Sequence, residues 1–207
     1  TLVGVLTKGI MDDGRGFART KVFNFSHEAN NGRTSSIGQE IMGFDGQKVV
    51  EPERVNASKN QTWAHIASNS NKIVTFLDLC GHEKYLKTTM FGLVGLLPDF
   101  CMVIVGANMG VSRMTKEHLG ITLALKIPLF IVITKIDIAP KNVYEDTQNT
   151  LIKIMRSPSV NKTPIVVKDS DDISIFADKL ASNKVTPIFN ISNVTGEGLP
   201  RLKEFLS

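Results

Sequence analysis

The fold is decided by an apolar run and the polar residues that follow it, Leu129-Phe130-Ile131-Val132-Ile133-Thr134-Lys135-Ile136-Asp137. Unbroken apolarity with many β-branched residues predicts a strand that is covered on both faces, and such strands are typical of parallel sheets. Thr134 to Asp137 therefore follow the carboxyl end of a strand. Open α/β sheets bind their ligands beyond that end, so these residues are the first candidates for a site.

Other apolar runs resemble the first one and predict further strands of the sheet: Ile73–Leu77, Met102–Val105 and, after Pro187, Ile188–Ser192. Helical patterns lie between them. The clearest is an apolar face that includes Val143, Leu151 and Met155 and stops before Ser157-Pro158; others begin near Thr115 and cover Leu199 to Leu206. This alternation predicts an α/β fold, an open and mostly parallel sheet with helices on both faces and right-handed crossovers.

Length and composition set the outer limits. The chain has 207 residues, 42% of them apolar, which suffices for one sizeable globular domain or two small ones. The net charge of +4 favours polyanionic partners without demonstrating one. Cys80 and Cys101 predict reduced thiols without a disulfide partner, and no apolar run reaches the ~18–20 residues that span a bilayer. We therefore expect a cytoplasmic protein with no membrane partner.

Residues 9–71 have a different character. They are rich in Gly, Asn, Ser and charged residues and show little sustained periodicity, which predicts a functional or mobile region. The stretch Asp169-Ser170-Asp171-Asp172 predicts the cap of the following helix. Of the four histidines, His27, His65, His82 and His118, none has the spacing of a zinc site, so only His82 remains a candidate.

A first candidate site is Asp78-Leu79-Cys80-Gly81-His82, directly after the run that ends at Leu77. A carboxylate at a strand end can hold Mg²⁺ through water, because Mg²⁺ gives up its waters reluctantly. Gly81 lets its amide approach a terminal phosphate closely, and His82 would then lie where it can orient an attacking water. The alternative is a plain strand-end turn with a capping Asp and a surface His.

A second candidate is Thr134-Lys135-Ile136-Asp137. A carboxylate that accepts from both the ring N–H and the exocyclic amine of guanine separates guanine from adenine, and the lysine stem can pack over the base. The alternative is a helix-capping Asp with a solvated Lys. The stretch Asn190–Gly196, which includes Ser192 and Asn193, could complete the base pocket with its backbone amides, or it could be no more than a turn.

The order of these loops resembles the GTPases of translation. More closely, the stretches at 14–19, 32–36, 78–89 and 192–197 are similar to the GTP-binding protein one and two subfamily, distant relatives of elongation factor Tu, and the likeness covers nearly all 207 residues. It implies a P-loop-GTPase-type sheet, and places residues 9–71 in the switch I region and an insertion.

The resemblance also implies roles for single residues. Thr34 would be the switch I threonine on Mg²⁺, Asp78 and Gly81 the switch II pair, and His82 the catalytic residue that positions water. Lys135 and Asp137 would bind guanine next to Ser192 and Asn193. Thr134 stands where this motif more often has asparagine.

One family motif is absent. No Gly-x-x-x-x-Gly-Lys-[Ser/Thr] occurs, although that loop cradles the β- and γ-phosphates. The chain begins Thr1-Leu2-Val3-Gly4-Val5-Leu6-Thr7, which matches the family just after the loop. We therefore expect the first strand, the phosphate loop and the downstream β-barrel domains to be missing. Truncation explains this better than natural loss, and we expect these 207 residues alone to bind GTP weakly and to be inactive.

The function that the resemblance implies is Mg²⁺-dependent hydrolysis of GTP to GDP, in translation or mRNA turnover. The implied partners are the ribosome, tRNA or mRNA-decay machinery. The alternative is an interaction module that binds a guanine nucleotide or a protein without hydrolysis. A dinucleotide-dependent oxidoreductase is disfavoured because no Gly-x-Gly-x-x-Gly follows a strand.

Overall fold

The computed structural model describes residues 1–52, 58–170, 173, 176, 179–180 and 182–207. The chain divides into two compact units, residues 1–92 with 203–207 and residues 93–202. The predicted cap at 169–172 lies partly outside the described residues, as do positions 53–57 of the predicted switch I region. Among the described helices, none combines the length and the apolar character that a membrane span requires.

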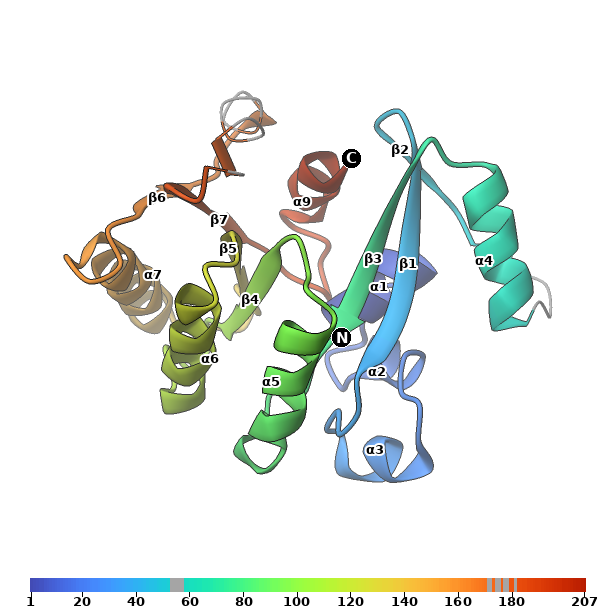
Figure 1. Ribbon diagram of the computed structural model, residues 1–207, viewed down its shortest axis with the longest axis horizontal. Coiled ribbons are helices and arrows are strands. Elements are labelled where there is room, and N and C mark those ends of the chain that lie inside the picture. The colour runs from blue at the N-terminus through green and yellow to red at the C-terminus, as the bar shows by residue number, and fades with distance from the viewer. Residues whose placement is uncertain (53–57, 171–172, 174–175, 177–178, 181) are drawn as a thin grey trace. The chain divides into compact units, whose positions relative to one another are not determined.

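The first unit contains α1 (Leu2–Lys8), α2 (Phe17–Thr20), α3 (Ser26–Asn31), β1 (Gly38–Asp45), β2 (Lys48–Val50), α4 (Lys59–Ser68), β3 (Lys72–Asp78), a 3-10 turn (Glu83–Tyr85) and most of α5 (Leu86–Gly95). Its strands form an antiparallel sheet in the order β2-β1-β3 (Figure 1). The register of β1 on β3 runs from Gly38 opposite Asp78 to Phe44 opposite Lys72. This pairing fixes where β3 ends.

Two helices pack closely in this unit where glycine allows it. Gly4 of α1 faces α2, and a Cβ at this position would clash with the carbonyl oxygen of Ala18. Gly43 of β1 faces α4, and a Cβ there would clash with the Ser70 hydroxyl and lie 2.6 Å from a methyl carbon of Ile66. The N-terminus of α4 is capped by Ser58, whose side chain accepts from the Gln61 amide.

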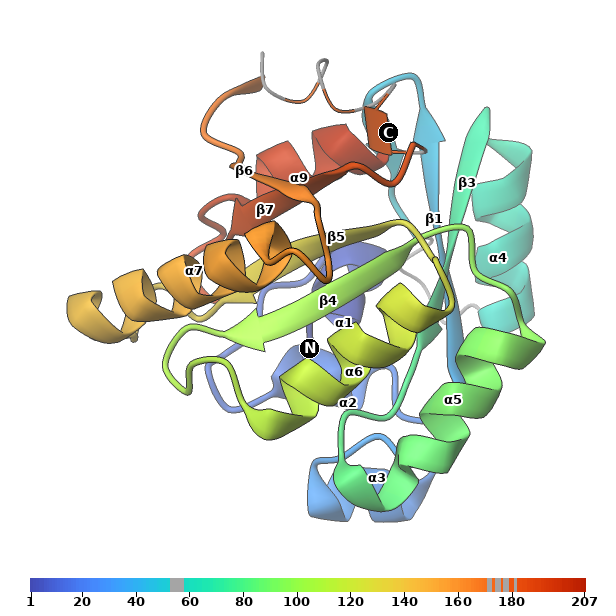
Figure 2. The same ribbon diagram turned by 60° about the vertical axis from the view of Figure 1, so that its left-hand side comes forward.

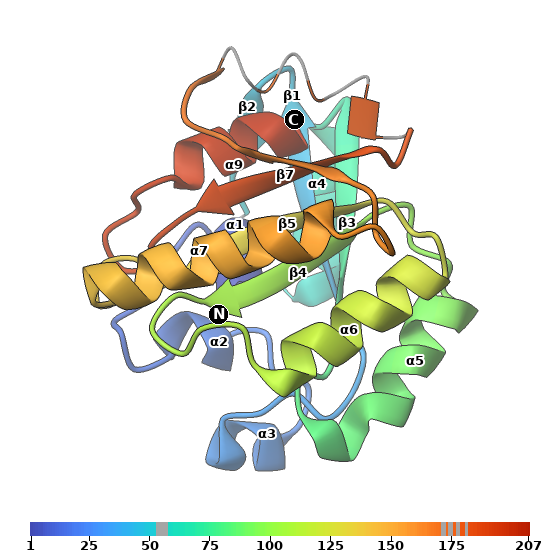
Figure 3. The same cartoon turned by 90° about the vertical axis from the view of Figure 1, so that its left-hand side faces the viewer.

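The second unit contains β4 (Cys101–Gly106), α6 (Arg113–Ala124), β5 (Leu129–Thr134), α7 (Lys141–Arg156), β6 (Thr163–Val166), β7 (Val185–Asn190) and the start of α9 (Leu199–Leu206). Its strands form a parallel sheet in the order β4-β5-β7-β6 (Figure 2). Helices α6 and α7 lie on one face of this sheet (Figure 3). Every residue of β5 is buried, as its apolar run predicts.

Alternate residues of the parallel strands supply the core under α6 and α7. Val105, Ile131, Ile133 and Ile188 from the strands are buried in one cluster with Leu119, Leu151 and Met155 from the helices. The intervening residues Phe130 and Phe189 belong to the opposite face, where their rings meet edge to face at 6.2 Å. The sheet is therefore covered on both faces at β5 and β7.

The structure confirms the α/β class, the parallel sheet and the predicted strands at 102–105 and 129–133. The helices predicted around Val143–Met155, near Thr115 and over Leu199–Leu206 are also present. The predicted strand Ile188–Ser192 exists but runs from Val185 to Asn190. It ends earlier because Ser192 belongs to a turn in which its amide donates to the carbonyl oxygen of Glu197.

The prediction for Ile73–Leu77 was right about the strand and wrong about its sheet. β3 pairs antiparallel with β1 and is not part of the parallel sheet. Its apolar run is not covered on both faces, since Ile73 remains 45% exposed. The sequence analysis also missed β1, β2 and α4, because it found little periodicity in residues 9–71.

The packing at Gly4 predicts that Gly4→Ala lowers the free energy of unfolding by about 1–3 kcal/mol, because the added methyl group must displace α2 backbone. Gly120, on the exposed face of α6, has no atom within 4 Å of a Cβ and provides the control. Gly120→Ala should stabilise by roughly 0.5–1 kcal/mol. Urea unfolding of both variants measures the difference, and equal effects would contradict the packing described for α1.

Candidate functional site

In the first unit, the end of β3 lies against the loop that precedes β1. Asp78 pairs with Gly38, and the Cys80 thiol donates to the carbonyl oxygen of Ser36 at 3.5 Å. The hydroxyl of Thr89 in α5 donates to the Cys80 carbonyl oxygen at 2.5 Å and so holds the turn from the other side. The structure therefore brings the segment that bears Thr34 next to the turn 78–82.

Asp78 and Thr34 are both half-buried. Burial raises the pKa of the Asp78 carboxyl, and the charges of Glu28 and Glu40 raise it further. A carboxylate whose charge is disfavoured in this way gains from a nearby cation.

The donor set near Asp78 fits a magnesium ion that is only partly held by protein. Among the described residues there is no group of three or more His, Cys, Asp or Glu side chains that could hold a metal. Mg²⁺ is usually held by one or two protein oxygens together with water and substrate phosphates. Thr34 and Asp78 can supply those oxygens. Gly81 is exposed, with no atom within 4 Å of a Cβ, so its amide is open to a phosphate.

His82 lies on the wall of a polar cavity of about 460 Å³, lined by His27, Asn30, Asn31, Arg33, His82, Lys84 and Tyr85. Its Nδ1 accepts from the Lys84 amide at 3.1 Å, so in the neutral ring the proton is on Nε2. With that tautomer, Nε2 can donate to a water or phosphate oxygen but cannot remove a proton.

Sequence reasoning missed Glu28, which is fully buried in α3. Its carboxylate accepts from the amides of Ser35 and Ser36, directly after Thr34. One weak signal for it exists in the sequence, a glutamate in the first turn of a short helix, where it can accept from amides that precede the helix. Its contact with Ser35 and Ser36 depends on the folded loop and has no sequence signature.

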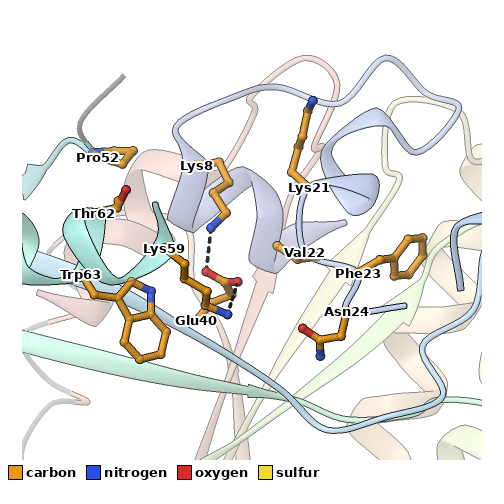
Figure 4. A pocket seen from close by; sticks show the side chains of 10 residues that line it. All are labelled: Lys8, Lys21, Val22, Phe23, Asn24, Glu40, Pro52, Lys59, Thr62 and Trp63. Carbon is orange, nitrogen blue, oxygen red and sulfur yellow. Dashed lines mark hydrogen bonds and ion pairs between the residues drawn. The ribbon is translucent and has the colours of Figure 1, made fainter. Parts of the chain in front are cut away.

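A second buried carboxylate, Glu40, serves a different purpose in the same unit. It binds the ammonium groups of Lys8 at 2.7 Å and Lys59 at 3.0 Å beside a cavity of about 440 Å³ (Figure 4). Lys59 also lies 5.1 Å from the ring centroid of Trp63. Glu40 thus joins α1, β1 and α4.

In the second unit, the predicted base-reading residues follow β5. Thr134 is buried and its hydroxyl donates to the Val105 carbonyl oxygen at 3.4 Å, which ties the end of β5 to β4. Lys135 has a φ of 62°, a left-handed conformation that is strained for a residue with a Cβ. Lys135 and Asp137 are exposed, so both side chains are open to a ligand.

The turn after β7 lies beside this segment, since the Ile136 amide donates to the Ile191 carbonyl oxygen at 3.5 Å. Ser192 is fully buried, and its hydroxyl oxygen accepts from the amides of Val194 and Thr195. The side chain of Ser192 therefore shapes the turn. Asn193 follows it and is 9% exposed.

Several carboxamide oxygens after these strands lack a donor. Within the described residues, the buried Oδ1 atoms of Asn108, Asn190 and Asn193 have no hydrogen-bond partner. Asn108 follows β4, whereas Asn190 and Asn193 lie at and after the end of β7. Buried acceptors without donors are costly, and a ligand with N–H groups would satisfy them. The sequence analysis named Asn193 but not Asn108, although an asparagine shortly after a buried strand was a usable signal.

These features define an α/β protein with candidate ligand-binding residues at the carboxyl edge of a parallel sheet. Comparison with known proteins then gives the family. The family model "Elongation factor Tu GTP binding domain" matches residues 1–207, and the chain belongs to this family.

The chain is 52% identical over 209 residues to GTP-binding protein 1 of Xenopus laevis and 47% identical over 208 residues to GTP-binding protein 2 of Homo sapiens. Both alignments cover 100% of this chain but only 32% and 34% of those proteins, so the chain spans about a third of their length. This confirms the predicted subfamily.

Solved structures support the fold. A bacterial selenocysteine-specific elongation factor EF-Sec matches with a TM-score of 0.62 and 18% identity, over 100% of this chain and 25% of that one. The elongation factor SelB of Methanococcus maripaludis, solved in complex with the GTP analogue GPPNHP, matches with a TM-score of 0.55 and 21% identity. That alignment covers 84% of this chain and 27% of SelB.

The backbone at Lys135 gives a paired prediction. Lys126 precedes β5 and has a similar φ of 57°. Replacing either residue by glycine should raise the free energy of unfolding by about 1 kcal/mol, because glycine adopts this conformation without strain. Lys135→Gly should also weaken GTP binding, whereas Lys126→Gly should not. Urea unfolding and nucleotide titration of both variants, made in the complete natural chain that contains these residues, separate strain from ligand contact. Equal GTP affinities of the two variants would exclude Lys135 from the site.

Proposed function

We propose that this domain binds GTP and, within its natural protein, hydrolyses it to GDP with Mg²⁺. The observation that carries the proposal is the position of the Thr34 segment, held against the turn 78–82 by the pairing of β1 with β3 and by the contact from Cys80 to Ser36. The Thr34 hydroxyl, the Asp78 carboxylate and the exposed Gly81 then belong to one unit. Membership of the elongation factor Tu family supports the same ligand.

The phosphate end of GTP would be bound by the first unit. Thr34 and Asp78 would hold Mg²⁺, which neutralises charge on the phosphates when bound. The Gly81 amide would donate to the terminal phosphate. Because Thr34 and Gly81 would both depend on that phosphate, its loss would release both segments, which is how a switch responds to hydrolysis.

His82 would position the attacking water. Its Nδ1 is occupied by the Lys84 amide, so Nε2–H is the group that can donate to the water oxygen. Fixing the water in line with the bond that breaks removes entropy from the barrier without a proton transfer to the ring. We assign His82 an orienting role and not that of a general base.

The guanine end would be bound by the second unit. The exposed Asp137 carboxylate would accept from two guanine N–H groups, and the stem of Lys135 would pack over the ring. Thr134 and Ser192 are buried and hydrogen-bonded within the protein, so they would shape the pocket and not contact the base through their hydroxyls. The unpartnered Oδ1 of Asn193 would be the further acceptor.

The biological partner would come from translation. Relatives of this chain include a selenocysteine-specific elongation factor of Haemophilus influenzae, 44% identical over 113 residues, besides the two GTP-binding proteins. We infer that the GTP-bound form binds the ribosome, tRNA or an mRNA-decay factor and that hydrolysis ends that contact.

Single-turnover hydrolysis tests the catalytic assignment. In the complete natural chain that contains these residues, His82→Ala should slow GTP cleavage by about 10²-fold or more while GTP affinity changes little. His65→Ala, at a half-buried position of α4, is the matched control and should leave the rate unchanged. Equal rates for His82→Ala and wild type would exclude His82, and GTP binding without any turnover in the wild type would favour a non-hydrolysing module.

Base selection provides an independent test. In the complete natural chain that contains these residues, Asp137→Asn should weaken GTP binding by roughly 10–100-fold through loss of charged hydrogen bonds. It should improve binding of xanthosine triphosphate, whose 2-oxo group needs a donor. Asp146→Asn, on the exposed side of α7, should change neither affinity. Isothermal titration calorimetry measures the affinities for GTP and xanthosine triphosphate. An unchanged preference for GTP would contradict the guanine pocket.

A further inference from the structure

We propose that Glu28 is a positioning residue that holds the loop around Thr34 in the conformation competent for GTP. The inference rests on the proposed function, because it gives Glu28 its role through Thr34. It adds Glu28 to the proposed site and explains how the loop around Thr34 would favour GTP over GDP. It is supported by the hydrogen bonds of the Glu28 carboxylate and by the contact of the Cys80 thiol with the Ser36 carbonyl oxygen.

The two oxygens of Glu28 bind opposite sides of the loop. Oε2 accepts from the amides of Asn24 at 3.0 Å and Phe25 at 3.3 Å, just before α3. Oε1 accepts from the Ser35 amide at 2.6 Å and from the Ser36 amide at 3.1 Å. The hydroxyls of Ser35 and Ser36 donate to the same oxygen at 2.8 Å and 3.1 Å. One buried carboxylate therefore closes the loop that contains Thr34.

The bond to the Ser35 amide acts directly on Thr34. That amide belongs to the peptide unit that joins Thr34 to Ser35, so Oε1 fixes the orientation of this unit. The peptide unit is planar, and fixing it restricts the backbone on which the Thr34 side chain stands. The Ser35 hydroxyl is further held by His27 Nε2 at 2.7 Å. Glu28 thus restricts the backbone from which the Thr34 side chain projects.

The Thr34 hydroxyl itself is not used by the fold. Among the hydrogen bonds that the described residues of this loop make, those to Glu28 come from Ser35 and Ser36 and none involves the hydroxyl of Thr34, a half-buried residue. A half-buried hydroxyl on a tightly held backbone is preorganised for a ligand and loses little entropy on binding. By contrast, the neighbouring serine hydroxyls both donate to Glu28. Ser35 and Ser36 therefore hold the loop through Glu28, and the Thr34 hydroxyl remains available to bind a ligand.

The chemistry requires a carboxylate at position 28. Glu28 accepts in all six hydrogen bonds, and an ionised carboxylate can only accept. A glutamine would turn two N–H donors toward other donors and would satisfy only one side of the loop. Although burial raises the pKa of Glu28, the bonds from Ser35, Asn24 and Ser36 lower it to about 2. The group therefore stays ionised throughout the pH range in which proteins function.

The decisive experiment compares two nucleotides in one variant. In the complete natural chain that contains these residues, Glu28→Gln should weaken binding of a non-hydrolysable GTP analogue with Mg²⁺ by about tenfold or more, while GDP affinity stays within about twofold. GDP lacks the γ-phosphate to which Thr34 responds, so it reports the remaining site. A tenfold change corresponds to about 1.4 kcal/mol. Equal weakening for both nucleotides, or none, would overturn the proposal.

Matched controls separate positioning from general destabilisation. Ser58→Ala removes the N-terminal cap of α4 in the same unit and should lower stability without changing the ratio of the two affinities. If Glu28→Gln does not fold, the double variant Ser35→Ala with Ser36→Ala removes two of the six donors and should shift the ratio in the same direction by a smaller amount. An unchanged ratio in that folded variant would also overturn the proposal.

The experiment distinguishes failure of this inference from failure of the proposed function. If the wild type binds neither nucleotide, the proposed function is wrong and the role of Glu28 falls with it. If the wild type binds both and Glu28→Gln leaves the ratio unchanged, only the role of Glu28 is wrong.

Discussion

A strand that is buried along its whole length must satisfy every peptide group in its own sheet, and this constraint decides where the chemistry of the domain can lie. β5 is buried from Leu129 to Thr134, so its amides and carbonyls depend on β4 and β7. Side chains that must meet a ligand cannot stand inside such a strand. They are displaced to its end, where Lys135 and Asp137 are exposed. The parallel direction of the neighbours then brings their ends to the same edge.

In the first unit, the pairing of β1 with β3 decides which polar residues lie close together. β3 is only partly covered and pairs antiparallel with β1, so the polar residues after β3 lie beside the residues before β1. Antiparallel pairing joins the end of one strand to the start of its neighbour. Asp78 consequently lies opposite Gly38, four residues after Thr34. In the second unit, parallel pairing places the carboxyl ends of β4, β5 and β7 at one edge of the sheet. In the first unit, antiparallel pairing places the end of β3 beside the start of β1.

The extent to which sequence predicts this molecule follows from the range of its interactions. Local patterns of apolar residues predict the strands at 102–105 and 129–133 and the helix around Leu151, and the structure contains all three. Asp78 and Asp137 could be nominated because each closely follows such a pattern. The partner of β3 could not be predicted in the same way, because pairing with β1 joins residues that are 28 (Phe44 and Lys72) to 40 (Gly38 and Asp78) positions apart, in a region without clear periodicity.

Glu28 illustrates a second reason for failure. A buried glutamate looks like any surface glutamate in a sequence, and only the folded loop shows that its donors come from Asn24 on one side and Ser36 on the other. The unpartnered oxygen of Asn108 is similar, since burial and the absence of a donor are both three-dimensional properties. Local patterns therefore predict where a site begins, and long-range contacts decide how its residues are held.

The contact between β1 and α4 has a consequence for how this sequence can change over time. Gly43 leaves no space for a Cβ, because the Ser70 hydroxyl and a methyl group of Ile66 already occupy it. A larger residue at 43 is acceptable only if 66 or 70 becomes smaller in the same lineage. These positions are thus expected to covary among related sequences, so an evolutionary record of paired changes would trace the packing of this helix on its strand.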